Sequence, residues 1–268
     1  MQELLWLSVT DNPGFNIAQH VEHLVAQGLD VNRSFVGRIF RSWLWSWKQP
    51  SHVQALKFTQ ENLIYYFVWI YAIPEVPWVT LKFLDESHFT SHDLRRRQAV
   101  GPRGARVGLI NSCPLRHSFS MTLLLDPATP TNPFYIYLRE ESNTEEDYLD
   151  FITQAVAAGR LVPGDLLVAD NAAIHAGQAT WPELIALLQR NGIRYVFLPK
   201  YSPELNPCEL VFAFIKNSIR RQYHHNPVEA LVVHALAAIT FTSLMKMYNE
   251  CTTIAERLSF FGWLPVMS

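Results

Sequence analysis

Three carboxylates in this sequence lie where a predicted strand gives way to a turn or a helix. Asp85 ends the strand predicted from "VTLKFLD", Asp170 ends "LLVAD", and Glu209 opens a helix directly after "YVFLP". In an α/β sheet, residues at such positions meet at one edge. Three clustered anions repel one another unless they are protonated, paired with Lys or Arg, or bound to a divalent cation. Carboxylate oxygens suit Mg²⁺, and two such ions about 4 Å apart would hold the attacking and leaving oxygens of a phosphodiester.

The stretch around Glu209 also has the pattern of a simple helix start. Pro207 suits the first helical position, because its missing N–H would be unpaired there. Asn206 is then the N-cap and Glu209 the third helical residue, which are the two positions of a capping pair. Taken alone, this pattern predicts a helix start rather than a catalytic site, so the function of Glu209 depends on the other acids. Glu204, inside the preceding turn, is not a predicted ligand.

Three polar residues near the first two acids each have a structural and a functional interpretation. Glu86 alternates to the strand face opposite Asp85, which predicts either a structural role or a place in a second layer of the site. Asn171, next to Asp170, either closes the turn after the strand or orients a water molecule. His175 has the chemistry of a general base, but metal-activated water makes such a base dispensable. We therefore expect His175 to support the carboxylates from a second layer of the site.

The elements that would position these acids follow from the periodicity of the chain. Three strands are predicted from "VTLKFLDESHF", "SFSMTLLLD" and "FYIYLRE", with a proline-rich connection between the last two. Helical spacing returns in "TEEDYLDFITQAVAAG", and strands then alternate with helices up to "NPCELVFAFIKNSIRRQY". This order predicts a mixed α/β domain whose later half forms a parallel sheet. We place the domain boundary near residues 74–78.

The residues before this domain have the pattern of two short helices joined by a turn. Apolar residues repeat at helical spacing up to Gly28, and a second apolar face follows Asn32, a predicted helix cap. No acidic residue occurs from position 31 to position 60. The second helix carries three arginines, Arg33, Arg38 and Arg41. The pattern predicts a DNA-binding helix-turn-helix, and the alternative is a helical hairpin with a solvated basic face.

A second group of arginines lies in the predicted loop after the first strand. Its members are Arg95, Arg96 and Arg97. Beside a site for an anionic substrate, such a run predicts a clamp for DNA phosphates, and the alternative is a solvated loop. These residues are therefore the second set of candidate DNA-binding residues.

Composition limits the class of protein. The chain has 268 residues, 49% of them hydrophobic and 13% aromatic, which is enough for a large core and excludes wholesale disorder. The formal net charge of −2 argues against a polycation that binds nucleic acid over its whole surface. Three cysteines without metal-ligand spacing indicate a reducing compartment, and no signal peptide follows Met1. The most apolar stretch, residues 63–73, is too short to span a bilayer and predicts a buried helix.

With these residues in place, the sequence resembles a known family. The blocks "FLDESHF", "VADNAAIH" and "LPKYSPELNPCELVFAFIK" resemble the three signature blocks of DDE-type transposases of the Tc/mariner superfamily. The third block is the most specific, because the run Tyr-Ser-Pro-x-Leu-Asn-Pro-x-Glu is long and unusual. Thirty-eight residues separate Asp170 from Glu209, within the spread of such families. The resemblance runs from Val79 to the end of the last long helix, and "VNRSFVGRIF" resembles the helix-turn-helix that precedes it.

The resemblance implies a fold, a site and a reaction. The fold would be a ribonuclease H-like mixed sheet with flanking helices in residues 74–268, after a helix-turn-helix region and linker helix in residues 1–73. Family members generally carry two helix-turn-helix units or a longer DNA-binding region. Asp85, Asp170 and Glu209 would be catalytic and would hold two Mg²⁺ or Mn²⁺ ions. The substrate would be double-stranded DNA, comprising transposon terminal repeats and a TA target, and the enzyme would be a homodimer.

Two other functions fit part of the same pattern. A ribonuclease H or resolvase-like nuclease has the same fold, but it would lack the N-terminal helix-turn-helix and would cut hybrids or junctions. A catalytically silent DNA-binding protein derived from a transposase would bind DNA without metal-dependent cleavage. We expect the protein to be nuclear in a eukaryote and cytoplasmic otherwise, with no secretion and no membrane partner.

Overall fold

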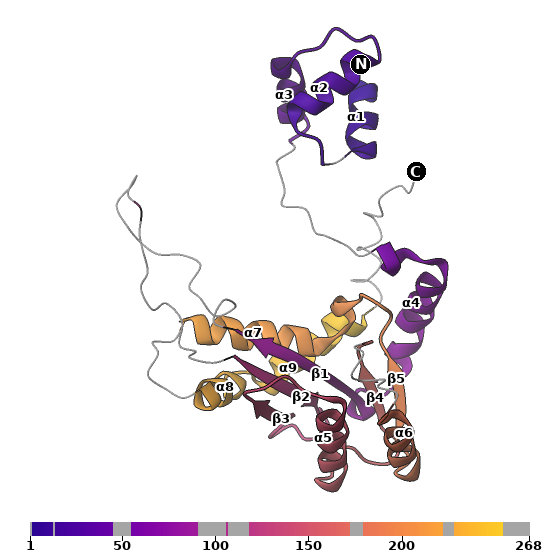
Figure 1. The fold of residues 1–268 in the computed structure, drawn as a ribbon, viewed down its shortest axis with the longest axis vertical. Coiled ribbons are helices and arrows are strands. Elements are labelled where there is room, and N and C mark those ends of the chain that lie inside the picture. Colours follow the sequence, from indigo (N-terminus) through magenta and orange to yellow (C-terminus); the bar gives the residue numbers. More distant parts are fainter. Residues whose placement is uncertain are drawn as a thin grey trace. The chain divides into compact units, whose positions relative to one another are not determined.

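A computed structural model describes residues 2–12, 14–44, 55–90, 106, 118–171, 179–221 and 228–253. These residues belong to two compact units, one within Met1–Gln54 and the other within Ala55–Arg257 (Figure 1). The division at residue 73 that the sequence suggests stays a prediction. Among the described residues, no single helix combines the length and apolarity needed to cross a membrane. Val228–Ala237 and Phe241–Thr252 meet those criteria only as a pair, bent by 84°.

Three short helices make up the N-terminal unit. They are α1 (Gln2–Asp11), α2 (Ile17–Ala26) and α3 (Arg33–Ser42). Asn16 caps α2 in a capping box with Gln19, and Gly28 adopts the left-handed φ of 83° that turns the chain after α2. Asn32 then caps α3 by accepting a hydrogen bond from the backbone of Phe35. The two predicted helices and their turn are confirmed, whereas the sequence pattern misses α1.

The core of the N-terminal unit draws on all three helices and the turn. Its buried members are Leu5, Leu24, Val31, Val36 and Ile39. Val25, which the helical spacing predicts on the apolar face of α2, is 52% exposed. Each residue rotates the side-chain direction by about 100° along a helix, so the position after the buried Leu24 turns toward solvent.

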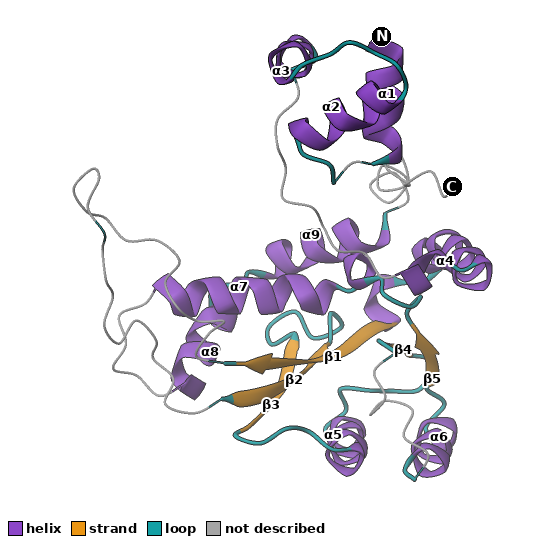
Figure 2. Cartoon of the chain, turned by 45° about the horizontal axis from the view of Figure 1, so that its top comes forward, coloured by secondary structure: helices purple, strands orange, loops and turns teal. Residues whose placement is uncertain are grey.

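A five-stranded mixed sheet forms the centre of the second unit. Its strands are β1 (Leu81–Phe89), β2 (Phe119–Leu125), β3 (Phe134–Arg139), β4 (Leu166–Ala169) and β5 (Arg194–Phe197). They lie in the order β3-β2-β1-β4-β5 (Figure 2). β2 is antiparallel to both β1 and β3, whereas β4 is parallel to both β1 and β5. The predicted ribonuclease H-like sheet with a parallel later half is therefore confirmed.

Helices cover both faces of this sheet. One face carries α5 (Glu145–Ala157) and α6 (Trp181–Arg190), as Figure 2 shows. The other face carries α7 (Pro207–Arg221), α8 (Val228–Ala237) and α9 (Phe241–Thr252). The sequence pattern predicts α5, α6 and α7 in the correct order and misses α8 and α9.

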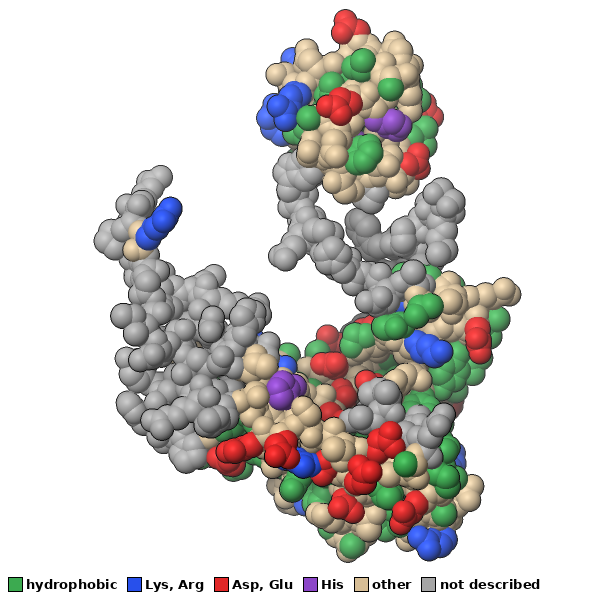
Figure 3. Space-filling view, in the orientation of Figure 1, with side chains coloured by type: hydrophobic (Ala, Val, Ile, Leu, Met, Phe, Trp, Pro, Cys, Tyr) green, Lys and Arg blue, Asp and Glu red, His purple; other side chains and the backbone are tan. Residues whose placement is uncertain are grey.

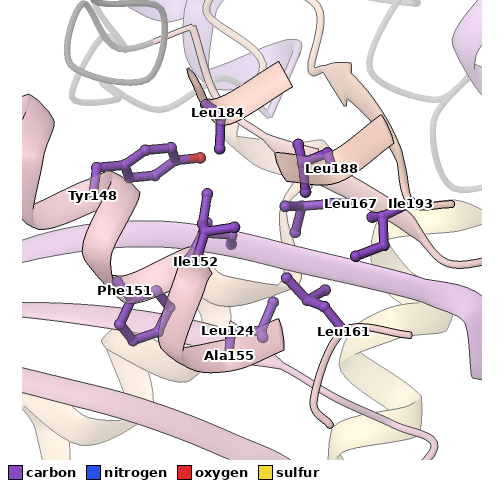
Figure 4. Close-up of a cluster of buried hydrophobic side chains, with 11 residues drawn as sticks. Leu124, Tyr148, Phe151, Ile152, Ala155, Leu161, Leu167, Leu184, Leu188 and Ile193 are labelled. Carbon is purple, nitrogen blue, oxygen red and sulfur yellow. The ribbon is translucent and has the colours of Figure 1, made fainter. Parts of the chain in front are cut away.

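The central strand β1 sends its side chains alternately to the two faces. Leu84 joins the apolar cluster beneath α5 and α6, whereas Phe83 packs against Tyr248 of α9 with ring centroids 5.4 Å apart. Figure 4 shows the cluster beneath α5 and α6. Its buried members are Leu84, Leu124, Tyr148, Phe151, Ile152, Ala155, Leu161, Leu167, Leu184, Leu188 and Ile193. Full burial of each large side chain contributes about 1.5–3 kcal/mol, so the cluster stabilises the sheet together with both helices.

Helix α4 (Gln60–Ala72) precedes the sheet within the second unit. It is flanked by short 3₁₀ helices, η1 (Ala55–Phe58), η2 (Ile73–Glu75) and η3 (Trp78–Thr80). Tyr66, Trp69 and Ile70 are buried, but Ile64 and Tyr71 are 58% and 60% exposed. The prediction of a buried helix is therefore wrong for half of its surface. An apolar stretch without polar positions does not reveal which side of a helix faces the core.

Candidate active site

Asp85 and Asp170 lie at the same level of two neighbouring parallel strands. The register of β1 and β4 pairs Leu84 with Ala169, and the two acids are the next residues along the chain. Asp85 is 5% exposed, and Asp170 is half-buried. β1 continues to Phe89, so Asp85 does not end its strand as the sequence predicts. The parallel ladder ends instead at Leu84, one residue before Asp85, because β4 stops one residue before Asp170.

Two hydrogen bonds orient the carboxylate of Asp85. Its Oδ1 accepts from the backbone N–H of Glu86 at 2.7 Å, and its Oδ2 accepts from the side-chain amide of Asn206 at 2.8 Å. Asn206 is 2% exposed, and its Oδ1 accepts from the backbone N–H of Cys208 at 3.0 Å, which caps α7. One amide side chain therefore joins the middle of β1 to the first turn of α7, across 121 positions of sequence.

Glu209 lies in the first turn of α7, which begins at Pro207 as predicted. The predicted capping pair forms only in part. Asn206 caps the helix, but its own N–H donates to the carbonyl oxygen of Pro203 at 3.0 Å, in the 3₁₀ helix η5 (Pro203–Leu205). A capping box would need that N–H for the side chain of Glu209. Helix capping therefore does not account for the carboxylate of Glu209.

Electrostatic interactions link the first turn of α7 to the strand aspartates. Glu209 is exposed at the surface, but the protein around its carboxylate displaces water and so raises its pKa; the cation of Lys216 lowers the pKa, and the negative charge of Asp170 raises it. The pKa of the buried Cys208 thiol depends on all three acids. Burial raises this pKa most, and the charges of Asp85, Glu209 and Asp170 raise it further. The first turn of α7 thus lies within electrostatic range of both strand aspartates. A cation among the acids would relieve their mutual repulsion.

The chemistry of this donor set fits a hard divalent cation. Carboxylate oxygens suit Mg²⁺ and Mn²⁺, and Mg²⁺ binds one or two of them together with water and substrate phosphate oxygens. Within the described ranges, no group of three or more His, Cys, Asp or Glu side chains is arranged to hold a metal ion by itself. Asp85, Asp170 and Glu209 would therefore hold the ions together with water and substrate, and their role as ligands stays a prediction.

Glu86 faces away from Asp85 and from α7. Its Oε1 accepts hydrogen bonds from the hydroxyl of Thr122 at 3.2 Å and from the side-chain amide of Asn143. Thr122 lies on β2, and Asn143 lies just before α5, the helix that covers the opposite face of the sheet. These contacts match the structural role that strand alternation predicts for Glu86.

Asn171 connects the ends of two strands. Its side-chain amide donates to the carbonyl oxygen of Leu198, which directly follows β5. Of the two roles expected for Asn171, this contact matches closure of the turn. His175 and the arginines at positions 95–97 lie outside the described residues, so their roles stay predictions.

Lys216 belongs to this site, although the sequence pattern did not single it out. Its Nζ lies 4.9 Å from the centre of the Phe89 ring, and its charge lowers the pKa of Glu209. Lys216 follows Glu209 by seven positions, and two helical turns place both on the same side of α7. That spacing is visible in the sequence and is the signal that could have found Lys216.

The arginines of α3 point away from the core of the N-terminal unit. Arg33, Arg38 and Arg41 are exposed, whereas Val36 and Ile39 on the same helix are buried. Basic side chains accordingly gather on the α3 side of this unit in Figure 3. The exposure that DNA binding requires is present, and contact with DNA stays a prediction.

Known proteins share this sequence pattern and this fold. The family described as DDE superfamily endonuclease matches residues 80–232. The Mos1 transposase paired-end complex with left transposon end has a TM-score of 0.69 at 15% identity, over 92% of this chain and 74% of that chain. The mariner Mos1 paired-end complex with Mg has a TM-score of 0.64 at 16% identity, over 92% and 75% of the two chains. The catalytic domain of Mos1 mariner transposase has a TM-score of 0.54 at 13% identity, over 76% and 93%.

No curated protein matches the sequence. The low identities to the Mos1 structures show a shared fold, which is a ribonuclease H-like sheet with flanking helices and an N-terminal helical region. The family match covers more than half of the chain and includes Asp85, Asp170 and Glu209. The chain therefore belongs to the family of DDE superfamily endonucleases.

Proposed function

We propose that this chain is a transposase that cuts and joins DNA at transposon ends with the help of divalent cations. One observation carries the proposal: the side chain of Asn206 fastens the helix start that bears Glu209 to Asp85, and Asp85 lies beside Asp170 on the neighbouring strand. Family membership supports the nuclease chemistry. The named content of the Mos1 complexes, a transposase with a transposon end, supports the class of substrate.

Each acid would hold the cations from a different element. Asp85 would do so from β1, with both of its oxygens already oriented by hydrogen bonds. Asp170 would act from the end of β4, and Glu209 would act from α7 in its deprotonated form, which the nearby Lys216 favours. When bound, two divalent cations activate the attacking oxygen and stabilise the leaving oxygen at a phosphodiester. We name Mg²⁺ as the resident ion and Mn²⁺ as its substitute.

The proposed reaction has two steps at phosphorus. Water first hydrolyses the phosphodiester at the transposon end and leaves a free 3′-hydroxyl. That hydroxyl then attacks a target phosphodiester, so one DNA bond forms as another breaks. The nucleophile is an oxygen of water or DNA in both steps. The site therefore needs no nucleophilic side chain and no covalent protein–DNA intermediate.

The N-terminal unit would hold the DNA. Its exposed arginines, Arg33, Arg38 and Arg41, would contact the phosphates of the terminal repeat, and the arginines at positions 95–97 would contact phosphates near the acids. We further propose a homodimer, because a transposon has two ends to cut. The substrate places the protein in the nucleus of a eukaryote or the cytoplasm of a prokaryote.

A cleavage assay tests this function directly. Full-length protein is incubated with DNA that carries the flanking ends of its own element, with and without Mg²⁺ or Mn²⁺. Metal-dependent nicks at the element boundary are expected. Cleavage of RNA–DNA hybrids or four-way junctions instead would favour a ribonuclease H or resolvase-like nuclease. Binding of the end DNA without cleavage under any metal condition would favour the catalytically silent DNA-binding protein.

A further inference from the structure

A short segment before the sheet contacts the loop that leads into α7. We call residues 57–65, at the end of η1 and the start of α4, the strap. The entry loop is residues 197–206, from the last residue of β5 to the cap of α7. Three side chains of the strap, Lys57, Asn62 and Tyr65, bond to the entry loop across 132 to 147 positions of sequence.

Asn62 forms hydrogen bonds with both backbone polar groups of one residue in the entry loop. Its Oδ1 accepts from the N–H of Lys200 at 2.8 Å, and its amide donates to the carbonyl oxygen of Lys200 at 3.1 Å. The same amide donates to the carbonyl oxygen of Lys57 at 2.9 Å, which ties the strap to itself. Asn62 is 6% exposed. Replacement would leave the part-buried N–H and carbonyl oxygen of Lys200 and the buried carbonyl oxygen of Lys57 without this partner, and unpaired backbone groups away from water are costly.

Lys57 and Tyr65 hold the entry loop at two other places. The ammonium of Lys57 pairs with the carboxylate of Glu204 at 2.5 Å, and the two side chains are 4% and 21% exposed. Removal of either partner would leave a poorly hydrated charge, so the pair acts as a unit. The hydroxyl of Tyr65 donates to the carbonyl oxygen of Phe197 at 2.5 Å, at the end of β5.

The backbone between these contacts is unusual. Tyr201 has a φ of 55°, a left-handed conformation that residues other than glycine rarely adopt. Such a conformation is unfavourable for a residue with a side chain and persists only where the surrounding structure determines it. The contacts at Lys200 and Glu204 restrain the chain on both sides of Tyr201. The entry loop then ends at Asn206, whose side chain binds Asp85.

We propose that the strap positions the active site, with Lys57 and Asn62 setting the place of Glu209 relative to Asp85. This inference rests on the proposed function, in which the acids bind the same cations. Lys57 and Asn62 are positioning residues, because they act through the entry loop and through Asn206. A displacement of about 1 Å in a catalytic group lowers a rate by about 100-fold, so a loosened entry loop would reduce turnover without removing any acid.

Hydrogen exchange of the full-length protein tests the first step of this inference without metal or DNA. In Asn62→Ala, the amides of residues 198–206 are expected to exchange faster than in the wild type, while those of β2 and α5 keep their rates. Ile64→Ala is the matched control, because Ile64 lies on the same helix and is 58% exposed. It should change none of these rates. Unchanged exchange of the entry loop in Asn62→Ala would overturn the proposal.

Binding of Mn²⁺, measured by calorimetry without DNA, tests the second step. Asn62→Ala should weaken Mn²⁺ binding about 10-fold or more, lower kcat for DNA cleavage and leave KM for DNA unchanged. A loosened entry loop with wild-type Mn²⁺ affinity and kcat would overturn the positioning role and leave the proposed function intact. A wild-type protein that neither binds Mn²⁺ nor cleaves DNA would overturn the proposed function and the positioning role together.

A double variant decides the matter if Asn62→Ala does not fold. Lys57→Met combined with Glu204→Gln keeps the shape of the pair and removes both charges, a change that buried pairs often tolerate. This variant should fold, show faster exchange at residues 201–206 and bind Mn²⁺ more weakly than the wild type. Exchange and affinity equal to those of the wild type would show that the strap does not position the acids.

Discussion

Glu209 shows how one residue can satisfy a local pattern and still serve another purpose. The sequence places it three residues after Asn206, where a capping partner belongs. In the structure, the N–H of Asn206 donates to the carbonyl oxygen of Pro203. The carboxylate of Glu209 lies within electrostatic range of Asp170. The local pattern therefore predicted the helix start correctly and the partner of Asn206 incorrectly. Asn206 instead binds Asp85, which lies too far away in sequence for any local pattern to reveal.

Replacement of Glu209 by Gln separates its chemistry from its place in the helix. Gln keeps the size and helix propensity of Glu but offers no anionic oxygen to a divalent cation. Without metal, the melting temperature of Glu209→Gln should stay close to that of the wild type. Metal-dependent cleavage should be lost, and so should the stabilisation by metal, which is about 2.7 kcal/mol at a concentration 100 times Kd. Thermal denaturation with and without Mn²⁺ and the cleavage assay provide both measurements.

Glu183→Gln is the matched control for this variant. Glu183 is also exposed, also follows a proline, and occupies the same position in the first turn of α6 as Glu209 does in α7. It should retain cleavage and metal stabilisation. Cleavage by Glu209→Gln at the wild-type rate would show that Glu209 is a surface residue of a helix start and not a ligand.

The pH dependence of metal binding should reveal the environment of Glu209. Partial desolvation of the carboxylate and the charge of Asp170 raise the pKa of Glu209, and metal binding needs the deprotonated form. Binding of Mn²⁺ should therefore weaken as pH falls through a window above the ordinary pKa of Glu. The folded state holds this proton more tightly than the unfolded chain, so the same acidification should raise stability rather than lower it. The two measurements should move in opposite directions.

Lys216→Met should shift that window. Lys216 lowers the pKa of Glu209, so its removal should raise that pKa and move the acid limb of Mn²⁺ binding to higher pH. Lys246→Met removes an exposed lysine of α9 that does not contribute to the pKa of Glu209, and it should leave the limb in place. Calorimetric titrations at a series of pH values would measure the shift. A limb at the same pH in both variants would contradict the electrostatic coupling.

At the scale of elements, the contacts of the strap determine which substitutions can serve as controls without effect. Glu204 lies in a turn and is not a predicted ligand, so the sequence alone predicts that its replacement by Gln is nearly silent. The structure argues against that prediction, because Glu204 pairs with the buried Lys57 across 147 positions of sequence. Removal of one partner from a buried ion pair leaves a charge that neither water nor protein stabilises. Sequence periodicity contains no trace of such a contact.

Glu204→Gln is therefore expected to destabilise the protein by about 3 kcal/mol, the lower end of the range for breaking a buried pair. The double variant Lys57→Met with Glu204→Gln should recover most of that loss, since no unpaired charge remains. Urea denaturation of the wild type, both single variants and the double variant gives the coupling energy. Equal stability of Glu204→Gln and the wild type would mean that the pair contributes nothing.

Elements with a clear amphipathic period were predictable, and elements without one were not. α3 alternates buried Val36 and Ile39 with exposed arginines, and its sequence pattern shows the same face. From Leu63 onward α4 has no polar face, so its sequence predicts burial, yet Ile64 and Tyr71 face solvent. The spacing of apolar residues along the sequence indicates which face of an element is apolar. Only tertiary packing decides how much of that face is covered.

At the scale of the whole molecule, topology explains why the sequence predicts that the strand acids meet and does not predict which residues support them. The order of strands and helices predicts a parallel half-sheet, and ligands bind at the carboxyl ends of such strands. Asp85 and Asp170 accordingly lie side by side just beyond the last paired residues of β1 and β4, although β1 itself continues past Asp85. The supports, among them Asn62 and Lys57, come from a helix that precedes the sheet and have no motif of their own. Their positions depend on packing between distant segments, which periodicity does not encode.

The N-terminal unit allows a test of how a chain with a net charge of −2 holds DNA. If Arg38 and Arg41 contact phosphates, Arg38→Gln and Arg41→Gln should weaken binding and flatten the dependence of log K on log salt concentration by about 0.9 for each lost contact. Arg190→Gln, an exposed arginine of α6 in the other unit, is the charge-matched control and should leave the slope unchanged. Fluorescence anisotropy with labelled end DNA at several salt concentrations measures all three. Equal slopes in every variant would leave α2 and α3 as a helical hairpin with a solvated basic face.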